Sequence, residues 1–174
     1  NLPLGFSAPP TFIEAGQNNT NIALFADAKA VNPDPKAPEI KIVGTAMIDG
    51  KQVTREAMGT LPKVVEPGDI VTTTDVKSVT IHPSQETRLL VHVERRNGFK
   101  GRIPLDVQGL PHGVRVLNVG LNGILVTERD TSREIVLYAE PWVQPMEHPF
   151  VVLANREGKG TQHAAQSVLL KVEK

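Results

Sequence analysis

At residues 86–94 the sequence reads ETRLLVHVE, in which apolar and polar side chains alternate. Successive side chains of a β-strand point to opposite faces, so Leu89, Val91 and Val93 share one face and polar residues occupy the other. Such a strand buries one face against a core and exposes the other to water. No window of the chain carries the i, i+3, i+4 apolar stripe of an amphipathic helix. The sequence therefore predicts an all-β fold.

The same alternation recurs along the second half of the chain. Further stretches with strand character are residues 78–83, 102–107, 114–116, 124–126, 134–138, 150–153 and 166–172. Turn signals such as Asn97-Gly98 and Asn122-Gly123 separate them. Seven or eight short strands in about 105 residues are typical of a Greek-key sandwich. We predict a complete immunoglobulin-like Greek-key β-sandwich over residues 76–174, with Pro104 at a sheet edge or a bulge because proline cannot donate to a ladder.

Part of this unit occurs twice. LPLGF at residues 2–6 matches LPHGV at 110–114, and NIALFAD at 21–27 matches EIVLYAE at 134–140. In the same order, IKIVG at 40–44 parallels FVVLA at 150–154, and a Gly-Lys turn follows each. Internal similarity in a conserved order indicates a repeated structural unit. Residues 1–62 are therefore predicted to be the C-terminal half of an immunoglobulin-like unit whose complete copy follows.

Residues 63–75 contain Pro67, Gly68 and a run of threonines, and we interpret them as a linker. Half a sandwich exposes an apolar face and unpaired strand edges, which is unstable in water. We expect upstream sequence, a partner chain (including self-association through the incomplete repeat) or packing on the second unit to complete it. The first residues carry neither an initiator Met nor a recognisable signal peptide, so we expect the chain to belong to a longer protein.

Composition argues against several classes of partner. Nineteen basic and nineteen acidic residues give a net charge of zero, without the basic patch of a nucleic-acid binder. No apolar stretch approaches the ~20 residues of a spanning helix, so membrane insertion is not expected. Cysteine is absent, which rules out disulfides and thiolate metal sites.

Motifs for catalysis are missing as well. The five histidines form no HExxH or His-x-His spacing, and His112 and His148, both next to proline, are interpreted as turn residues. No serine lies in Gly-x-Ser-x-Gly. We predict no enzymatic activity, no metal site and no cofactor. Two histidines meeting in space, or a Ser/His/Asp set assembled from distant loops, are the alternatives.

Two loops could bind a ligand. Trp142, the only tryptophan, lies in a proline-rich connection, where it could stack on a sugar or anchor a partner. The alternative, which we favour, is that it plugs the end of the sandwich. The basic loop 95–100 contains Arg96 and Phe99, and a solvated hairpin tip with Phe99 stapling the turn is the simpler interpretation.

Residues 83–116 resemble a known family. PSQET at 83–87, NGFKG at 97–101 and GLPHGV at 109–114 are similar to turns of NEW3-type (alpha-galactosidase-associated) and related immunoglobulin-like accessory domains of bacterial exported proteins. The usual glycine of the first turn is Ser84 here. The resemblance implies a fold and a setting in large secreted or envelope-attached proteins, often in tandem, and it implies no catalytic residues.

These observations favour a non-catalytic structural or interaction module, a spacer or adhesive repeat of a larger bacterial protein outside the cell or in its envelope. We expect its partners to be other domains of the same protein, with proteins or glycans as alternative ligands. The alternative is a carbohydrate-binding accessory module that uses Trp142 or the Phe99 loop.

Overall fold

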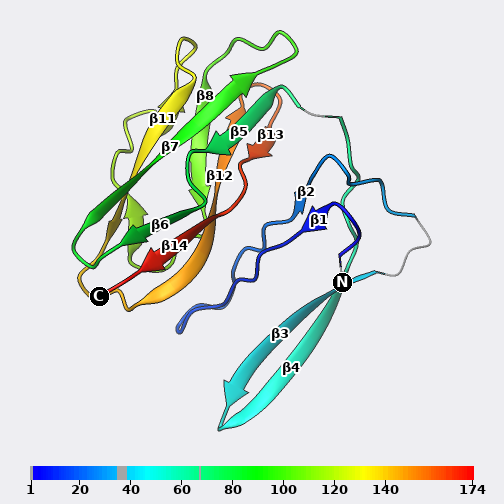
Figure 1. The fold of residues 1–174 in the computed structure, drawn as a ribbon, viewed down its shortest axis with the longest axis vertical. Helices are drawn as coiled ribbons and strands as arrows, with labels where there is room; N and C mark the ends of the chain where they lie inside the picture. The colour runs from blue at the N-terminus through cyan, green and yellow to red at the C-terminus, as the bar shows by residue number, and fades with distance from the viewer. Residues whose placement is uncertain (1, 35–38, 67) are drawn as a thin grey trace. The chain divides into compact units, whose positions relative to one another are not determined.

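The computed structural model describes residues 2–34, 39–66 and 68–174, and all regular elements in these ranges are strands (Figure 1). The strands are β1 (Phe6–Ser7), β2 (Phe25–Ala26), β3 (Ile40–Ile48), β4 (Lys51–Gly59), β5 (Ile70–Thr74), β6 (Ser78–Ile81), β7 (Glu86–Arg95), β8 (Ile103–Gln108), β9 (Val114–Val116), β10 (Ile124–Val126), β11 (Ser132–Ala139), β12 (Met146–Arg156), β13 (Thr161–Ala164) and β14 (Val168–Val172). The predicted all-β class is confirmed. Among the described residues, none forms a helix with the length and apolar character needed to span a bilayer.

The chain divides into two compact units. The smaller one takes in residues 2–8 and 24–66 except 35–38, and the larger one takes in residues 9–23 and 68–174. Residues 9–23 thus belong with the larger unit, although the sequence analysis placed them in the half-unit. They join two segments of the smaller unit yet pack with the sandwich.

The larger unit consists of two sheets around one core. One sheet has the order β5-β7-β11-β9, and the other has the order β10-β8-β12-β14-β6, with β13 paired to β12. All pairs are antiparallel except β14 with β6. The buried cluster draws side chains from both sheets, including Leu89 and Leu137 from one and Val152 and Leu170 from the other.

Strand β7 follows the predicted alternation. Leu89, Val91 and Val93 are at most 4% exposed, whereas Arg88 and His92 are exposed. Burying an aliphatic side chain of this size stabilises a fold by about 1.5–3 kcal/mol. The period-two pattern of this strand therefore supplies a substantial part of the free energy that holds the two sheets together.

Two sequence-based expectations were wrong in detail. Residues 70–74 of the predicted linker form β5, with Ile70 3% exposed, because they pair with β7 from Ile70–Arg95 to Thr74–Val91. The complete unit therefore begins before residue 76. Pro67, also counted in that linker, lies outside the described residues. Pro104 is not on an edge strand, since β8 pairs with both β10 and β12. Strand β12 pairs with β8 only from Leu105 onward, so the missing N–H of Pro104 removes no hydrogen bond to β12.

The smaller unit contains two strand pairs, β1 with β2 and β3 with β4. The β3–β4 hairpin turns at Asp49 and Gly50, whose φ angles of 50° and 74° are both positive. Positive φ at both central residues characterises the type I′ turn, which an Asp-Gly pair favours. The hairpin is paired along its whole length, from Ile40–Gly59 to Ile48–Lys51.

The corner formed by β1 and β2 matches the corner formed by β9 and β11. Phe6 pairs with Ala26 and Ser7 with Phe25, just as Val114 pairs with Ala139 and Arg115 with Tyr138. Three backbone hydrogen bonds also correspond. In the smaller unit they are Phe6 N–Pro3 O (3.1 Å), Asp27 N–Gly5 O (2.8 Å) and Ala30 N–Asp27 O (3.0 Å), and in the larger unit Val114 N–Pro111 O (3.0 Å), Glu140 N–Gly113 O (2.9 Å) and Val143 N–Glu140 O (3.1 Å).

Candidate functional site

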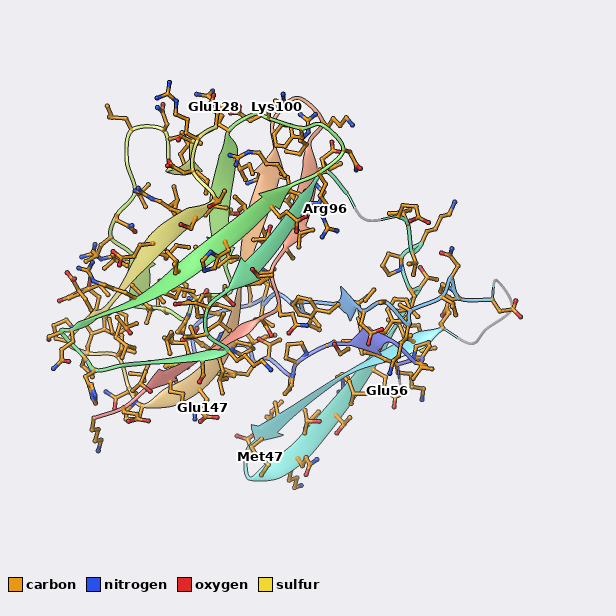
Figure 2. All side chains as sticks on the ribbon, turned by 45° about the horizontal axis from the view of Figure 1, so that its top comes forward. Met47, Glu56, Arg96, Lys100, Glu128 and Glu147 are labelled. Carbon is orange, nitrogen blue, oxygen red and sulfur yellow. The ribbon has the colours of Figure 1, made fainter. Side chains whose placement is uncertain are left out.

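The predicted binding residues lie at opposite ends of the larger unit. The loop 95–101 follows the end of β7 that pairs with the start of β11, where Ser132 faces His92. Trp142 follows the other end of β11, where Tyr138 faces Glu86. Figure 2 shows Arg96, Lys100 and Glu128 toward one end and Glu147 toward the other. Trp142 therefore cannot form one site with Arg96 and Phe99.

Trp142 is held against the corner that precedes β9. Its side chain is 52% exposed, and its ring lies 4.8 Å from the ring of His112 at an angle of 41°. Gly113 lies directly beneath the indole, because a Cβ atom there would come within 2.6 Å of the Trp142 ring. Half of the indole covers the end of the sandwich, and the other half faces solvent.

A pocket of about 300 Å³ lies next to this corner, and His112 is one of its lining residues. It is lined by Phe12, Glu14, Gln17, Asn19, Thr20, Asn21, Gly109, Leu110, His112 and His148. The segment 9–23 supplies the first six, and the corner before β9 and strand β12 supply the rest. This volume is at the small end of the range for ligand sites, which suits a small polar ligand.

Two contacts fix the segment 9–23 at the pocket. The backbone N–H of His112 donates to both carboxylate oxygens of Glu14, at 3.0 and 3.2 Å. The ring of Phe12 meets the ring of His148 edge-on, with 4.5 Å between centroids and an interplanar angle of 72°. A charge-assisted bond and an aromatic edge contact each stabilise such an arrangement by roughly 1 kcal/mol.

His148 was predicted in a turn, and that prediction is wrong. It lies in β12, is 3% exposed, and its Nδ1 lies 3.1 Å from the carbonyl oxygen of Pro149. A carbonyl only accepts, so this contact places the ring proton on Nδ1. The prolines on either side suggested a turn, but β12 continues through Pro149, which pairs with Leu169.

At the opposite end, Phe99 and Arg96 are engaged within the protein. The guanidinium of Arg156 lies 3.9 Å from the centroid of the Phe99 ring, and that ring also covers Gly101. Arg96 donates from Nε and Nη2 to Glu94, at 2.8 and 3.0 Å. This hydrogen-bonded pair raises the pKa of Arg96 and lowers that of Glu94. The Phe99 ring therefore packs against Arg156 and its own loop.

Asp69 ties the start of β5 to this end of the sandwich. Its carboxylate accepts from Arg156 (3.0 Å), Lys159 (3.2 Å) and Asn97 (3.3 Å). The hydrogen bond from Arg156, followed by those from Lys159 and Asn97, holds the pKa of Asp69 below its ordinary value. Near it, burial lowers the pKa of His163. The described residues contain no group of three or more histidines, aspartates or glutamates gathered so as to hold a metal ion.

The pocket beside Trp142 is thus the best candidate site, and its chemistry is that of binding. Amide side chains of Gln17, Asn19 and Asn21 offer donors and acceptors, while the Phe12 ring supplies an apolar wall. The backbone N–H of His112 already donates a hydrogen bond to the Glu14 carboxylate.

The sequence analysis identified Trp142 but missed this pocket, because residues 9–23 lack strand periodicity. Its one usable signal was the run of amide side chains QNNTN at 17–21.

Comparisons with known proteins gave little further definition. No protein-family model matches the chain, so the likeness to NEW3-type domains rests on the quoted turns alone. No curated protein matches it. Among solved structures, the crystal structure of the S-layer protein SbsC domains 4 and 5 is similar, with 14% identity and a TM-score of 0.41, covering 94% of this chain and 89% of that one. This score is too low to define a shared fold.

Proposed function

We propose that the chain is a non-catalytic structural module, built from immunoglobulin-like units in tandem and belonging to a larger bacterial exported or envelope protein. One observation carries the proposal: the β1–β2 corner repeats the β9–β11 corner in strand register and in three hydrogen bonds. Repetition of one architectural unit within a chain, even in part, is typical of repeat arrays, in which each unit contributes length and surface.

The strand orders support the immunoglobulin-like assignment. In an immunoglobulin constant-type domain, the first strand pairs with the second and the fourth lies at the far edge of the same sheet. Taking β5, β7, β8, β9, β11, β12 and β14 as strands A to G reproduces the two sheets A-B-E-D and C-F-G. In this assignment β6 is a short strand that leaves the first sheet and pairs in parallel with β14.

An exchange of corners tests the tandem-unit proposal. Residues 110–115 of the full chain are replaced by residues 2–7, which converts LPHGVR into LPLGFS. Equivalent corners keep the glycine at the step where φ is positive, so the exchanged chain folds. Its thermal midpoint falls because Phe replaces Val114, which is 7% exposed in the core, at a cost of about 1–3 kcal/mol. A control chain carries the same six inserted residues in scrambled order.

The proposal predicts that the scrambled corner loses far more stability than the exchanged one, since only the latter keeps the turn. Equal destabilisation by both replacements would contradict the proposal, because residues 2–7 would then be no better than a scrambled sequence at forming the turn before β9. The measurement is thermal unfolding followed by near- and far-ultraviolet circular dichroism.

A second candidate function is glycan binding at the pocket beside Trp142. The observation that favours it is that His112 lines the pocket together with planar amide side chains and also contacts the half-exposed Trp142 ring. Sugars present hydroxyls to amides and C–H faces to aromatic rings. Glycan-array binding that is lost in Trp142→Ala and retained in Leu121→Ala, a change at a fully exposed position, would support it. No binding, or equal binding by both variants, excludes it.

A further inference from the structure

The smaller unit has apolar positions exposed where the larger unit has core. Aligning Ile40–Gly44 with Phe150–Ala154 places Ile42 at the position of Val152, and the two side chains are 44% and 0% exposed. Likewise Leu24 is half-buried and Ala26 exposed, whereas Leu137 and Ala139 are fully buried. These positions carry apolar residues of the kind a core buries, yet none of them is fully buried among the described residues.

The strands of the smaller unit also have free edges at corresponding places. Strand β12 pairs with β8 through Val151–Ala154, whereas the described residues give its counterpart β3 only β4 as a neighbour. Strand β11 pairs with β7 as well as with β9, whereas β2 pairs with β1. Unpaired edges with exposed apolar side chains are templates for another strand. Among the described residues, the strand neighbours absent from these two edges are of the β7 and β8 kind.

The order of elements in the larger unit indicates where in the sequence the missing strands would be connected. In the larger unit, β8 ends at Gln108, and only Gly109 separates it from the corner that starts at Leu110. The corresponding corner of the smaller unit starts at Leu2. A strand of the β8 kind would therefore join the smaller unit directly ahead of Leu2.

In its described residues, a second copy of the chain has no unpaired strands of the β7 and β8 kind with which to complete the smaller unit. Its smaller unit presents the same β1–β4 set, without strands of the β7 and β8 kind. In its larger unit, β7 lies between β5 and β11, and β8 lies between β10 and β12, so both are paired on each side. Completion by self-association would require one of these sheets to open.

We propose that the smaller unit is completed by a polypeptide segment of the β5–β8 kind that precedes Leu2 in the same protein. Its β8-like strand pairs with Lys41–Gly44 of β3, and its β7-like strand pairs with β2. This inference rests on the proposed tandem-unit function, and it names the surface through which the half-unit is joined.

The test supplies the segment from the protein itself. Residues 68–109 are duplicated and placed ahead of Leu2 in the full chain, in place of Asn1, so that the added Gly109 joins Leu2 as it joins Leu110. Amide hydrogen exchange is then measured at residues 24–26 and 41–44. We expect exchange there to slow by about tenfold or more relative to the unextended chain, since paired and covered amides exchange only on opening. Protected amides of β11 and β12 verify that the original sandwich is folded.

Two adjacent substitutions on β3 provide matched variants of the extended chain. Ile42 corresponds to inward-facing Val152, and Val43, 55% exposed, corresponds to half-buried Leu153 on the other face. Ile42→Lys places a charge in the new core, so the protection gained by extension is lost. Val43→Lys places the same charge on the outer face, so the protection gained by extension is kept.

Three results would overturn the inference. The first is amide exchange at 24–26 and 41–44 that does not change on extension, and the second is an equal effect of the two lysine substitutions. The third is an unextended chain that is a dimer by light scattering and already protected at 41–44, because a second copy would then be the occupant. If extension fails while the corner exchange succeeds, the tandem-unit proposal stands and only this completion falls. If the corner exchange fails, the proposed function itself falls.

Discussion

Gly5 and Gly113 adopt the same left-handed conformation, with φ of 84° and 87°, at the same step of their corners. An L-residue there is strained by about 1–2 kcal/mol. At Gly113 space is also lacking, because a Cβ atom would come within 2.6 Å of both the Trp142 ring and Val143 Cγ2. The sequence match between LPLGF and LPHGV therefore reflects a backbone requirement.

Gly113→Ala is expected to destabilise the larger unit by about 2–4 kcal/mol, the sum of backbone strain and overpacking. Gly123→Ala is the matched control, since φ there is 76° and a Cβ atom would meet nothing within 4 Å. It should cost only about 1–2 kcal/mol. Urea unfolding measures both, and equal costs would show that the close approach of Trp142 and Val143 does not constrain residue 113.

Asp69→Asn should lower stability in a pH-dependent way. The pKa of Asp69 lies below its ordinary value of 3.8, chiefly because Arg156 donates to it, so the folded state favours the carboxylate. Its contribution is therefore fully present above pH 3.8 and is lost as the pH falls through the lowered pKa. The difference in urea midpoint between wild type and variant should shrink over that interval. A difference that stays constant from pH 7 down to pH 2 would contradict this role.

At the scale of strands, period-two alternation located β7, β8 and β14, because alternate side chains of each strand are the more buried. Strand β11 was located by its apolar run, and it buries Val136 as well as Ile135 and Leu137. Alternation failed at β5, whose threonines resembled a polar linker. Thr72 is nonetheless 6% exposed, and its hydroxyl donates to the carbonyl oxygen of His163 at 2.9 Å. Because this hydrogen bond joins β5 to a strand distant in sequence, Thr72 can be buried in the core. The local sequence pattern cannot reveal such a contact.

Ile70→Ala is the direct test that residues 70–74 are a strand. Ile70 is 3% exposed within the core cluster, so its truncation should destabilise the larger unit by about 2–5 kcal/mol. Val65→Ala, at a position 74% exposed in the same predicted linker, should change stability by less than about 0.5 kcal/mol. Comparable effects at both positions would restore the linker interpretation. Equilibrium denaturation monitored by Trp142 fluorescence suits both variants.

For the whole molecule, sequence predicted the all-β class, since that class depends on local periodicity, whereas the relation between the two units stays a proposal. It did not predict that residues 9–23 would belong to the larger unit, nor the pocket they form there with His112 and His148. Their contacts, such as Glu14 with the His112 N–H, join residues far apart in the chain and leave no periodic trace.

The two units should differ greatly in local stability. The larger one buries a continuous cluster between two sheets, whereas the hairpin β3–β4 exposes Ile42, Val43 and Met47 at 44–68%. A two-stranded hairpin without a covered face is marginal in water. The full chain is thus expected to behave as one stable sandwich joined to a smaller unit that opens readily.

Residue-resolved native-state hydrogen exchange of the full chain measures this difference directly. Amides in the centre of β7, β11 and β12 should exchange only through global unfolding, while those of β3 and β4 should exchange at least about a hundredfold faster. Uniformly slow exchange in a monomer, with β3 as protected as β11, would contradict the account of one complete sandwich and one incomplete unit.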